Sequence, residues 1–190
     1  LTQMQADGVT PDVITFAGNG EPTLHPDFEY IISDTIVTRD ALCPKAKIAV
    51  LSNATQLHKE SVCRALNRVD DNILKIDSVL DSRIRQIDRP HASGFGFAQL
   101  LEQLKRFDGN LMIQTMFLKG DVDGQSVNNM TEEEITGWLD ALRQIAPKQV
   151  MIYTIDRETP AKGLLKATHE ELDGIAERVR QAGFNVSVSY

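Results

Sequence analysis

The sequence predicts an α/β fold built from parallel strand–helix–strand units. Short apolar runs alternate along the chain with segments whose apolar residues recur at helical spacing. Strands separated by helices of about 10–15 residues are typical of parallel βαβ units. The chain has 190 residues, enough for a sizeable core, and no stretch has the composition of a linker. We therefore expect residues 1–190 to form a single domain.

Composition narrows the class of protein. Apolar residues make up 42% of the chain and charged residues 25%, as in soluble globular proteins, and the net charge of −7 argues against a nucleic-acid interface spread over the whole surface. No apolar run approaches the roughly 18 residues of a membrane span, and the first residues do not resemble a signal peptide. The two cysteines, Cys43 and Cys63, are expected to be free thiols in a reducing cytoplasm.

Three strands are predicted in the first half of the chain. Residues 13–17 form an apolar run bounded by Pro-Asp and Gly, and residues 47–52 and 72–77 are similar runs. Helical spacing of apolar residues predicts helices over 28–38 and 58–66.

The second half continues the alternation. A Thr followed three residues later by Glu has the spacing of a capping box at Thr131 and at Thr168, and Gly183 is the predicted end of the last helix. The expected elements are, in order, a helix over 97–107, a strand over 111–118, a helix after Thr131, a strand over 149–155, a helix after Thr168 and a strand over 184–189. Residues 88–96, 120–129 and 156–168 are predicted to be long loops, of the kind that carries function in such folds.

A glycine turn, Gly18-Asn19-Gly20-Glu21-Pro22, follows the first predicted strand. Two glycines let a backbone turn sharply and approach a ligand closely. Glu21 is then held at the end of the strand, where its carboxylate can accept a bond from an amine or pair with a cation. The residues alone leave a plain strand–helix turn with a surface Glu equally open.

A second polar turn follows the second strand. Asn53 and Thr55 can donate to a ligand carboxylate, but as an isolated pattern they favour capping of the helix that begins near His58. Among the four histidines, which lack metal-ligand spacing, only His25 lies close to the glycine turn.

Alternation in the third strand places Lys75 and Asp77 on one face. Buried charges are costly without partners, so this pair needs each other, another group or a ligand, and a structural salt bridge is the simpler alternative. In the fourth strand Gln114 shares a face with two methionines, one of them Met116, and in the fifth strand Tyr153 lies on a similar face.

Taken together, these strand ends resemble those of the radical S-adenosylmethionine (SAM) enzymes. The likeness rests on the glycine turn, on Leu-Ser-Asn-Ala-Thr at 51–55 and on Leu-Lys-Ile-Asp-Ser at 74–78, and it continues through residues 113–117 and 151–156. It covers about residues 12 to 182. Within the family, the chain looks most similar to iron–sulfur oxidoreductases of the glycyl-radical-activating and wyosine-synthesis type.

The resemblance implies a partial, parallel (βα)6 barrel of the TIM type. It also implies a [4Fe–4S] cluster that binds SAM and cleaves it reductively to a 5′-deoxyadenosyl radical, which abstracts hydrogen from a substrate. By position, the turn from Gly18 through Asn19 and Gly20 to Glu21 would hold the methionyl amine. The remaining residues implied to line the cofactor or substrate are Asn53, Lys75, Asp77, Ser78, Gln114, Met116 and Tyr153.

The cysteines depart from the family pattern. The family ligates its cluster through Cys-x3-Cys-x2-Cys after the first barrel strand, upstream of the glycine turn, and three thiolates leave one iron open for the cofactor. This sequence lacks that motif. We expect an N-terminally truncated fragment that lacks the first strand and cysteine loop and is inactive by itself.

Two alternatives stay open. One is a cluster-free barrel enzyme of the aldolase or isomerase type with Lys75 as Schiff base or general base, and the other is a non-catalytic ligand-binding module. The substrate, whether protein, tRNA or small molecule, is not readable from the residues. A truncated barrel would expose the edge of the 13–17 strand, which we expect to pair with a neighbouring chain or with the 184–189 strand, or to aggregate.

Overall fold

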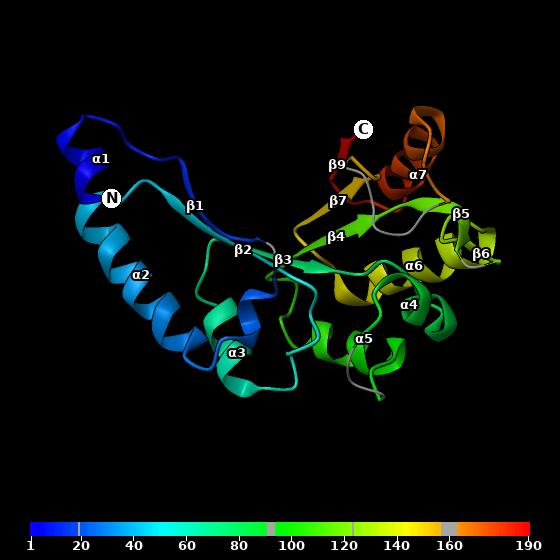
Figure 1. Ribbon diagram of the computed structural model, residues 1–190, viewed down its shortest axis with the longest axis horizontal. Coiled ribbons are helices and arrows are strands. Elements are labelled where there is room, and N and C mark those ends of the chain that lie inside the picture. The colour runs from blue at the N-terminus through cyan, green and yellow to red at the C-terminus, as the bar shows by residue number, and fades with distance from the viewer. Residues whose placement is uncertain (19, 91–93, 123, 157–162) are drawn as a thin grey trace. The chain divides into compact units, whose positions relative to one another are not determined.

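The computed structural model has an α/β fold (Figure 1). Its larger sheet has six strands in the order β1-β2-β3-β4-β7-β9, and a smaller sheet has the order β6-β5-β8. The α/β class predicted from the alternation of strands and helices is confirmed. The structure describes residues 1–18, 20–90, 94–122, 124–156 and 163–190.

The chain divides into two compact units, unit 1 (Leu1–Leu74) and unit 2 (Lys75–Tyr190). The strands are β1 (Val13–Phe16), β2 (Lys47–Ser52), β3 (Asp71–Lys75), β4 (Met112–Met116), β5 (Leu118–Val122), β6 (Gln125–Asn128), β7 (Gln149–Tyr153), β8 (Leu164–Lys166) and β9 (Val186–Ser189). The helices are α1 (Thr2–Ala6), the 3-10 helix η1 (Pro22–Leu24), α2 (Phe28–Leu42), α3 (Glu60–Leu66), α4 (Asp81–Ile87), α5 (Phe97–Lys105), α6 (Glu132–Ile145) and α7 (His169–Gln181).

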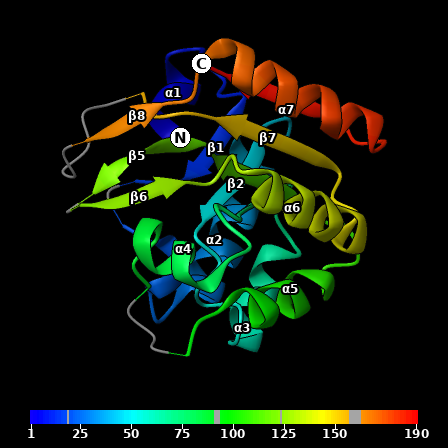
Figure 2. The same ribbon diagram turned by 90° about the vertical axis from the view of Figure 1, so that its right-hand side faces the viewer.

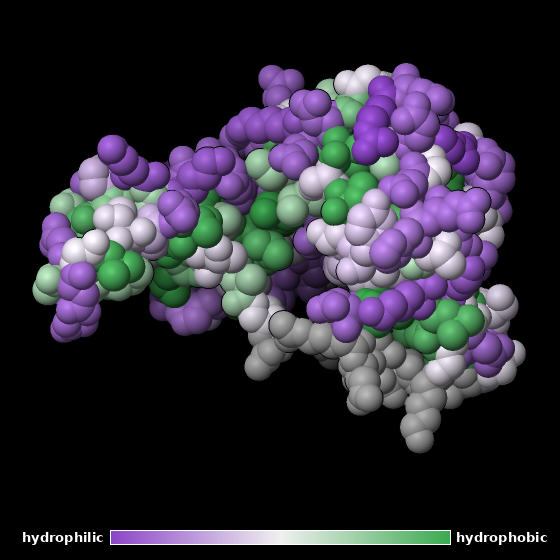
Figure 3. Space-filling model, turned by 90° about the horizontal axis from the view of Figure 1, so that it is seen from above, coloured by the Kyte–Doolittle hydropathy of each residue, from purple (hydrophilic) through white to green (hydrophobic). Residues whose placement is uncertain are grey.

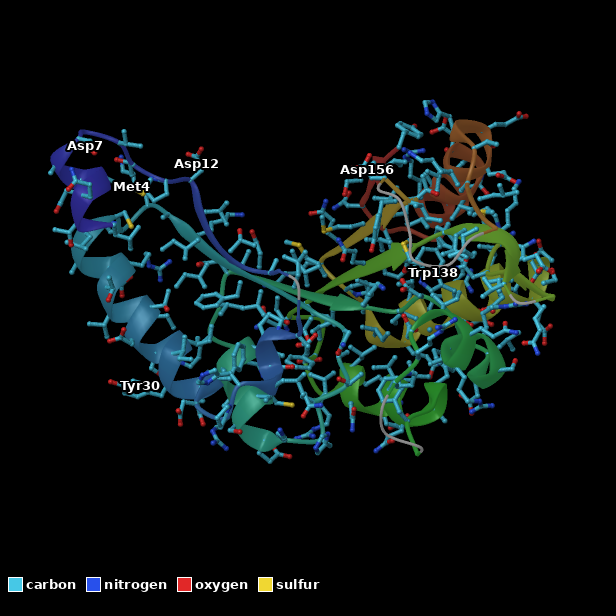
Figure 4. All side chains as sticks on the ribbon, in the orientation of Figure 1. Met4, Asp7, Asp12, Tyr30, Trp138 and Asp156 are labelled. Atoms are coloured by element: carbon cyan, nitrogen blue, oxygen red, sulfur yellow. The ribbon has the colours of Figure 1, made fainter. Side chains whose placement is uncertain are left out.

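Unit 1 is built on parallel pairing of β1 with β2 and of β2 with β3. The apolar run of β2 is buried, with Ile48 and Val50 fully covered, as its sequence predicts. Helix α2 extends beyond the predicted end at residue 38, to Leu42, and stops before Pro44, which disfavours helical backbone in the residue ahead of it. Tyr30 points away from α2 into solvent (Figure 4).

Unit 2 contains the parallel strands β4, β7 and β9. Helices α6 and α7 lie beside these strands (Figure 2), and α7 contacts both β7 and β9. Alternate residues of β4 and β7 are buried, while the other face is half-exposed. That half-exposed face carries Met112, Gln114, Met116, Met151 and Tyr153. The register places Gln114 beside Met151 and Met116 beside Tyr153.

The smaller sheet corrects part of the sequence prediction. Strands β5, β6 and β8 lie within or beside stretches that we expected to be loops, and β5 pairs antiparallel with both β6 and β8. The polar, glycine-containing sequence gives no alternation to predict them. Their pairing is supported instead by an apolar cluster of Leu118, Val127 and Ile155, which are distant in sequence.

Two further expectations differ from the structure. Helix α4 lies in a stretch where no element was predicted. The capping box at Thr168 is complete, but at Thr131 only the threonine half forms, because the Glu134 carboxylate bonds elsewhere. Gly183 has the left-handed conformation (φ +91°) expected at a helix end.

The edge of β1 stays unpaired within the described chain. β1 is the first strand in the sheet order and β9 the last, so the predicted pairing of these two strands is not what the sheet shows. Val13, at the start of β1, is 45% exposed. Association with another molecule through this edge remains a prediction.

Candidate cofactor-binding site

In unit 1 the glycine turn is fastened to the end of β2 by Glu21. One oxygen of this carboxylate, Oε1, accepts bonds from the backbone and hydroxyl of Thr23 and from the Ser52 hydroxyl (2.8 Å). The other, Oε2, accepts from the backbone N–H of Asn53 (2.7 Å). The turns that follow β1 and β2 are therefore joined by a single carboxylate, which the sequence placed at the strand end without showing its partners.

The backbone of the turn is open on its outer side. A Cβ added at Gly18 or at Gly20 would meet no atom within 4 Å. Beside the turn lies a pocket of about 580 Å³, which extends to α2 and is lined by Phe16, Ala17, Gly18, Gly20, Glu21, Pro22, Leu24, His25, Phe28 and Ile31. Figure 3 shows apolar residues exposed among polar ones over unit 1, at its left. Asn19 lies outside the described residues.

Asn53 makes a local turn and does not cap α3. Its Oδ1 accepts from the backbone (3.1 Å) and hydroxyl (2.7 Å) of Thr55, whereas α3 begins later, after Lys59. Between them Ala54 is fully buried with a positive φ of 63°, a conformation uncommon for residues other than glycine. The loop after β2 is thus tightly specified, and Asn53 itself is exposed.

In unit 2 Lys75 lies between two carboxyl groups. Its ammonium contacts Oδ2 of Asp77, and Oδ1 of Asp88 is 3.6 Å away. Asp77 is completely buried, and its Oδ1 accepts from the backbone N–H of Met116 (2.9 Å). Lys75 and Asp77 thus pair with each other, which is the structural salt bridge that the sequence left open as the simpler alternative, and Asp88 is a third member that sequence reasoning missed.

These groups perturb one another's ionisation. Burial lowers the pKa of Lys75, but the Asp77 carboxylate, with Tyr153 and Asp88, outweighs burial, and the net pKa is raised. Burial and the neighbouring Asp77 raise the pKa of Asp88 to about 8. Burial also raises the pKa of Tyr153. At neutral pH the group therefore holds a charged lysine, a protonated Asp88 and a protonated tyrosine.

The remaining predicted residues of unit 2 fall into two places. Gln114 lies on the half-exposed face of β4, two residues from Met116 on the same side. The Ser78 hydroxyl donates to the buried carboxylate of Glu134 (2.7 and 2.9 Å), which also accepts from the backbone of Val79 (3.0 Å). Ser78 thus belongs to a buried support between the end of β3 and α6.

Asn129 is a second residue that the sequence did not single out. Its amide donates to the backbone carbonyls of Asp77 (2.8 Å) and Met116 (2.7 Å), and its Oδ1 accepts from Leu118 (2.9 Å). It is 1% exposed. A single asparagine in a polar stretch has no sequence pattern that would reveal such a role.

An iron–sulfur cluster does not fit the residues of this chain. Three thiolates are needed and the sequence has two cysteines, Cys43 after α2 and Cys63 within α3, both buried. No group of three or more His, Cys, Asp or Glu side chains in the described part of the chain is placed to hold a metal ion. Nor does any described helix have the length and apolar character of a membrane span.

Comparison with solved structures shows which class of fold this is. The chain superposes with a TM-score of 0.70 on a radical SAM methyltransferase from Sphaerobacter thermophilus, at 16% identity, covering 100% of this chain and 54% of that one. A domain of pyruvate-formate lyase-activating enzyme from Bacteroides vulgatus gives 0.67 at 15% identity, with 93% and 98% covered. Streptococcus suis SuiB bound to S-adenosylmethionine gives 0.67 at 16% identity, with 100% and 41% covered. The fold is that of a partial radical SAM barrel.

Sequence comparison also finds similar curated proteins. The chain is 31% identical to a UPF0026 protein of Synechocystis over 78% of this chain and 52% of that protein. A UPF0026 protein of Helicobacter pylori is 28% identical, over 85% of this chain and 49% of that protein. The chain therefore spans about half the length of the curated relatives it matches. No protein-family model matches it.

Proposed function

We propose that this chain is the SAM-binding part of a radical SAM enzyme. The observation that supports this most is the Glu21 carboxylate, which joins the open glycine turn after β1 to the polar turn after β2. The fold shared with radical SAM enzymes, and a solved neighbour that contains SAM, point in the same direction. The carboxyl ends of parallel strands are where α/β folds bind their ligands.

In this proposal the methionyl amine binds at the glycine turn. A carboxylate has about four lone-pair sites, and Glu21 already accepts four bonds from its own unit, three on Oε1 and one on Oε2, so little acceptor capacity is left for a ligand. The backbone carbonyls of the turn, including those of Gly18 and Gly20, are then the better acceptors for the amine, and Glu21 holds the turn in place. Asn53 is proposed to contact the methionyl or ribose part.

In unit 2 the proposal assigns Lys75 and Asp77 to the ribose or the methionyl carboxylate, and Gln114 with Tyr153 to the adenosyl or substrate side. The bonds of Ser78 to Glu134 make Ser78 the weakest of the proposed ligands. When bound, a [4Fe–4S] cluster would supply the electron for SAM cleavage, but this chain's two cysteines do not fit it. The residues described here therefore account for cofactor binding and not for the redox step.

Equilibrium binding of SAM tests the proposal. We expect the chain to bind SAM in calorimetry, and Gly20→Val to weaken binding at least tenfold, because its side chain occupies open space at the turn without meeting other atoms. Gly174→Val, at a position in α7 that is equally open, is the matched control and should bind as well as the unmodified chain. No binding by the unmodified chain would refute the proposal.

The enzymatic part needs a separate test on the complete gene product. After anaerobic purification we expect brown iron–sulfur absorbance, and 5′-deoxyadenosine after reduction in the presence of SAM. If neither is found while SAM still binds, the second candidate, a non-catalytic ligand-binding module, becomes the better description, and the two-cysteine sequence already favours it. The aldolase-type alternative is disfavoured, since a raised pKa keeps the Lys75 amine protonated and unable to attack a carbonyl.

A further inference from the structure

The pocket beside the glycine turn has aromatic and aliphatic walls. Its volume of about 580 Å³ lies within the range of roughly 300–1,000 Å³ that is usual for small-molecule sites. Phe16, at the end of β1, is half-buried, and Phe28, at the start of α2, is buried. Leu24 and Ile31 add aliphatic surface. Because these four side chains offer no hydrogen-bonding groups, they suit a part of a ligand that needs none.

The charge next to this pocket is negative. Glu21 is among the lining residues, and its carboxylate accepts its four bonds from two backbone N–H groups and two hydroxyls. Such neutral donors stabilise a negative charge without cancelling it. Residues 1–38, which include β1 and most of α2, contain six Asp and Glu and no Lys or Arg. The pocket therefore favours a positively charged group electrostatically.

A cation in this pocket must carry its charge without hydrogen-bond donors. Glu21 has little acceptor capacity left, so an ammonium that entered the pocket would lose its bonds to water without full replacement. A sulfonium differs, because its positive sulfur bears only carbon substituents and has no hydrogen to donate. The faces of aromatic rings attract cations of this kind. Two phenylalanine rings and an uncancelled carboxylate thus match a sulfonium better than an ammonium.

We propose that the pocket is the subsite for the sulfonium group of SAM, and that Phe16 is a specificity-determining residue there. This inference rests on the proposed SAM-binding function. The short methionyl chain joins the sulfonium to the amine, so an amine at the Gly18 and Gly20 carbonyls brings the sulfonium to the adjoining pocket. Phe16 and Glu21 would then distinguish SAM from S-adenosylhomocysteine, an uncharged thioether that lacks the sulfonium methyl group.

Calorimetric titration with SAM and with S-adenosylhomocysteine tests this specificity. We expect the unmodified chain to bind SAM about tenfold more tightly, because only SAM carries the cation that the rings and the carboxylate attract. Phe16→Leu keeps an apolar side chain and removes the ring. Glu21→Gln keeps the shape and removes the charge. Each variant should lower the preference for SAM, the ratio of the two dissociation constants, by about threefold or more.

Two matched controls carry the same substitutions away from the pocket. Phe184→Leu changes a half-buried phenylalanine of unit 2, and Glu29→Gln changes an acid of α2 whose carboxylate is bonded to Arg64. Neither residue lines the pocket, so both variants should keep the preference of the unmodified chain. Glu21→Gln also loosens the glycine turn, but that loss weakens both compounds and cancels in the ratio.

The outcomes separate this inference from the proposed function. Equal affinity of the unmodified chain for the two compounds overturns the inference and leaves SAM binding intact. An unchanged ratio in Phe16→Leu or in Glu21→Gln also overturns it, as does an equal fall in the two controls. Absence of SAM binding by the unmodified chain overturns both the inference and the proposed function.

Discussion

Replacing Asn129 by alanine removes three buried hydrogen bonds at once. The side chain holds the carbonyls of Asp77 and Met116 and the N–H of Leu118, all at 2.7–2.9 Å, and is 1% exposed. A buried polar group left without a partner costs about 1–3 kcal/mol, so three such groups predict a loss of about 4 kcal/mol. Domains of ordinary size have about 5–15 kcal/mol in total, which makes this a large fraction.

Urea unfolding measures this loss. Trp138 is the one tryptophan in the sequence and is buried in unit 2, where its indole N–H donates to Thr115 (3.0 Å), so its fluorescence reports on the unit that contains Asn129 (Figure 4). Asn128→Ala is the matched control: this neighbour is half-buried and its side chain accepts one bond, from Met130 (2.9 Å), so we expect a loss of about 1 kcal/mol. Equal losses for the two variants would refute the reasoning.

Three other changes have definite expected outcomes. Glu21→Gln should lower the free energy of unfolding of unit 1, measured by urea unfolding with circular dichroism, by about 2–3 kcal/mol, since an amide N–H then faces a backbone donor. The partly exposed Glu29→Gln should lower it less, and an equal loss would contradict the role of Glu21. Stability should decrease as pH rises from about 4 through 8, because native Asp88 keeps a proton that the unfolded chain releases. The melting temperature of Asp88→Asn should not show this decrease. Identical pH profiles of melting temperature for the two proteins would exclude this role of Asp88. Gly163→Ala should destabilise unit 2 by more than about 2 kcal/mol, since φ is +96° and a Cβ would lie 2.3 Å from a backbone oxygen. Gly124→Ala, where φ is +76° and the space is open, should cost about 1 kcal/mol. The reverse order of stability losses in thermal melts would be inconsistent with the packing of β5 against β8.

Most strands of the larger sheet are predictable because local sequence is enough to specify them. The apolar run 47–52 is β2 with the same bounds, and each run that is bounded by turn residues has few alternatives to a buried strand. The hairpin and third strand of the smaller sheet are different. Their sequences are polar and contain glycine, and their pairing is supported by the packing of Leu118, Val127 and Ile155.

The same division holds at the candidate site. Alternation in the third strand predicts that Lys75 and Asp77 share a face, and the glycine turn is visible as a motif. No local pattern shows that Asp88 approaches the same lysine. Nor does any local pattern show that the Glu134 carboxylate accepts from Ser78 instead of completing the capping box at Thr131. Those partners come from elements that fold back from elsewhere in the chain.

The sequence by itself determined the α/β class, the positions of the strand ends and the polar residues that occupy them. Periodicity and turn chemistry are local properties, and they act wherever the chain is placed. The tertiary structure decided what those residues do: Glu21 joins two turns, Ser78 supports a helix, and Asp88 stands beside Lys75. Charge and hydrogen bonding act over a few ångströms of space, so their outcome depends on which distant segments the fold brings within that range.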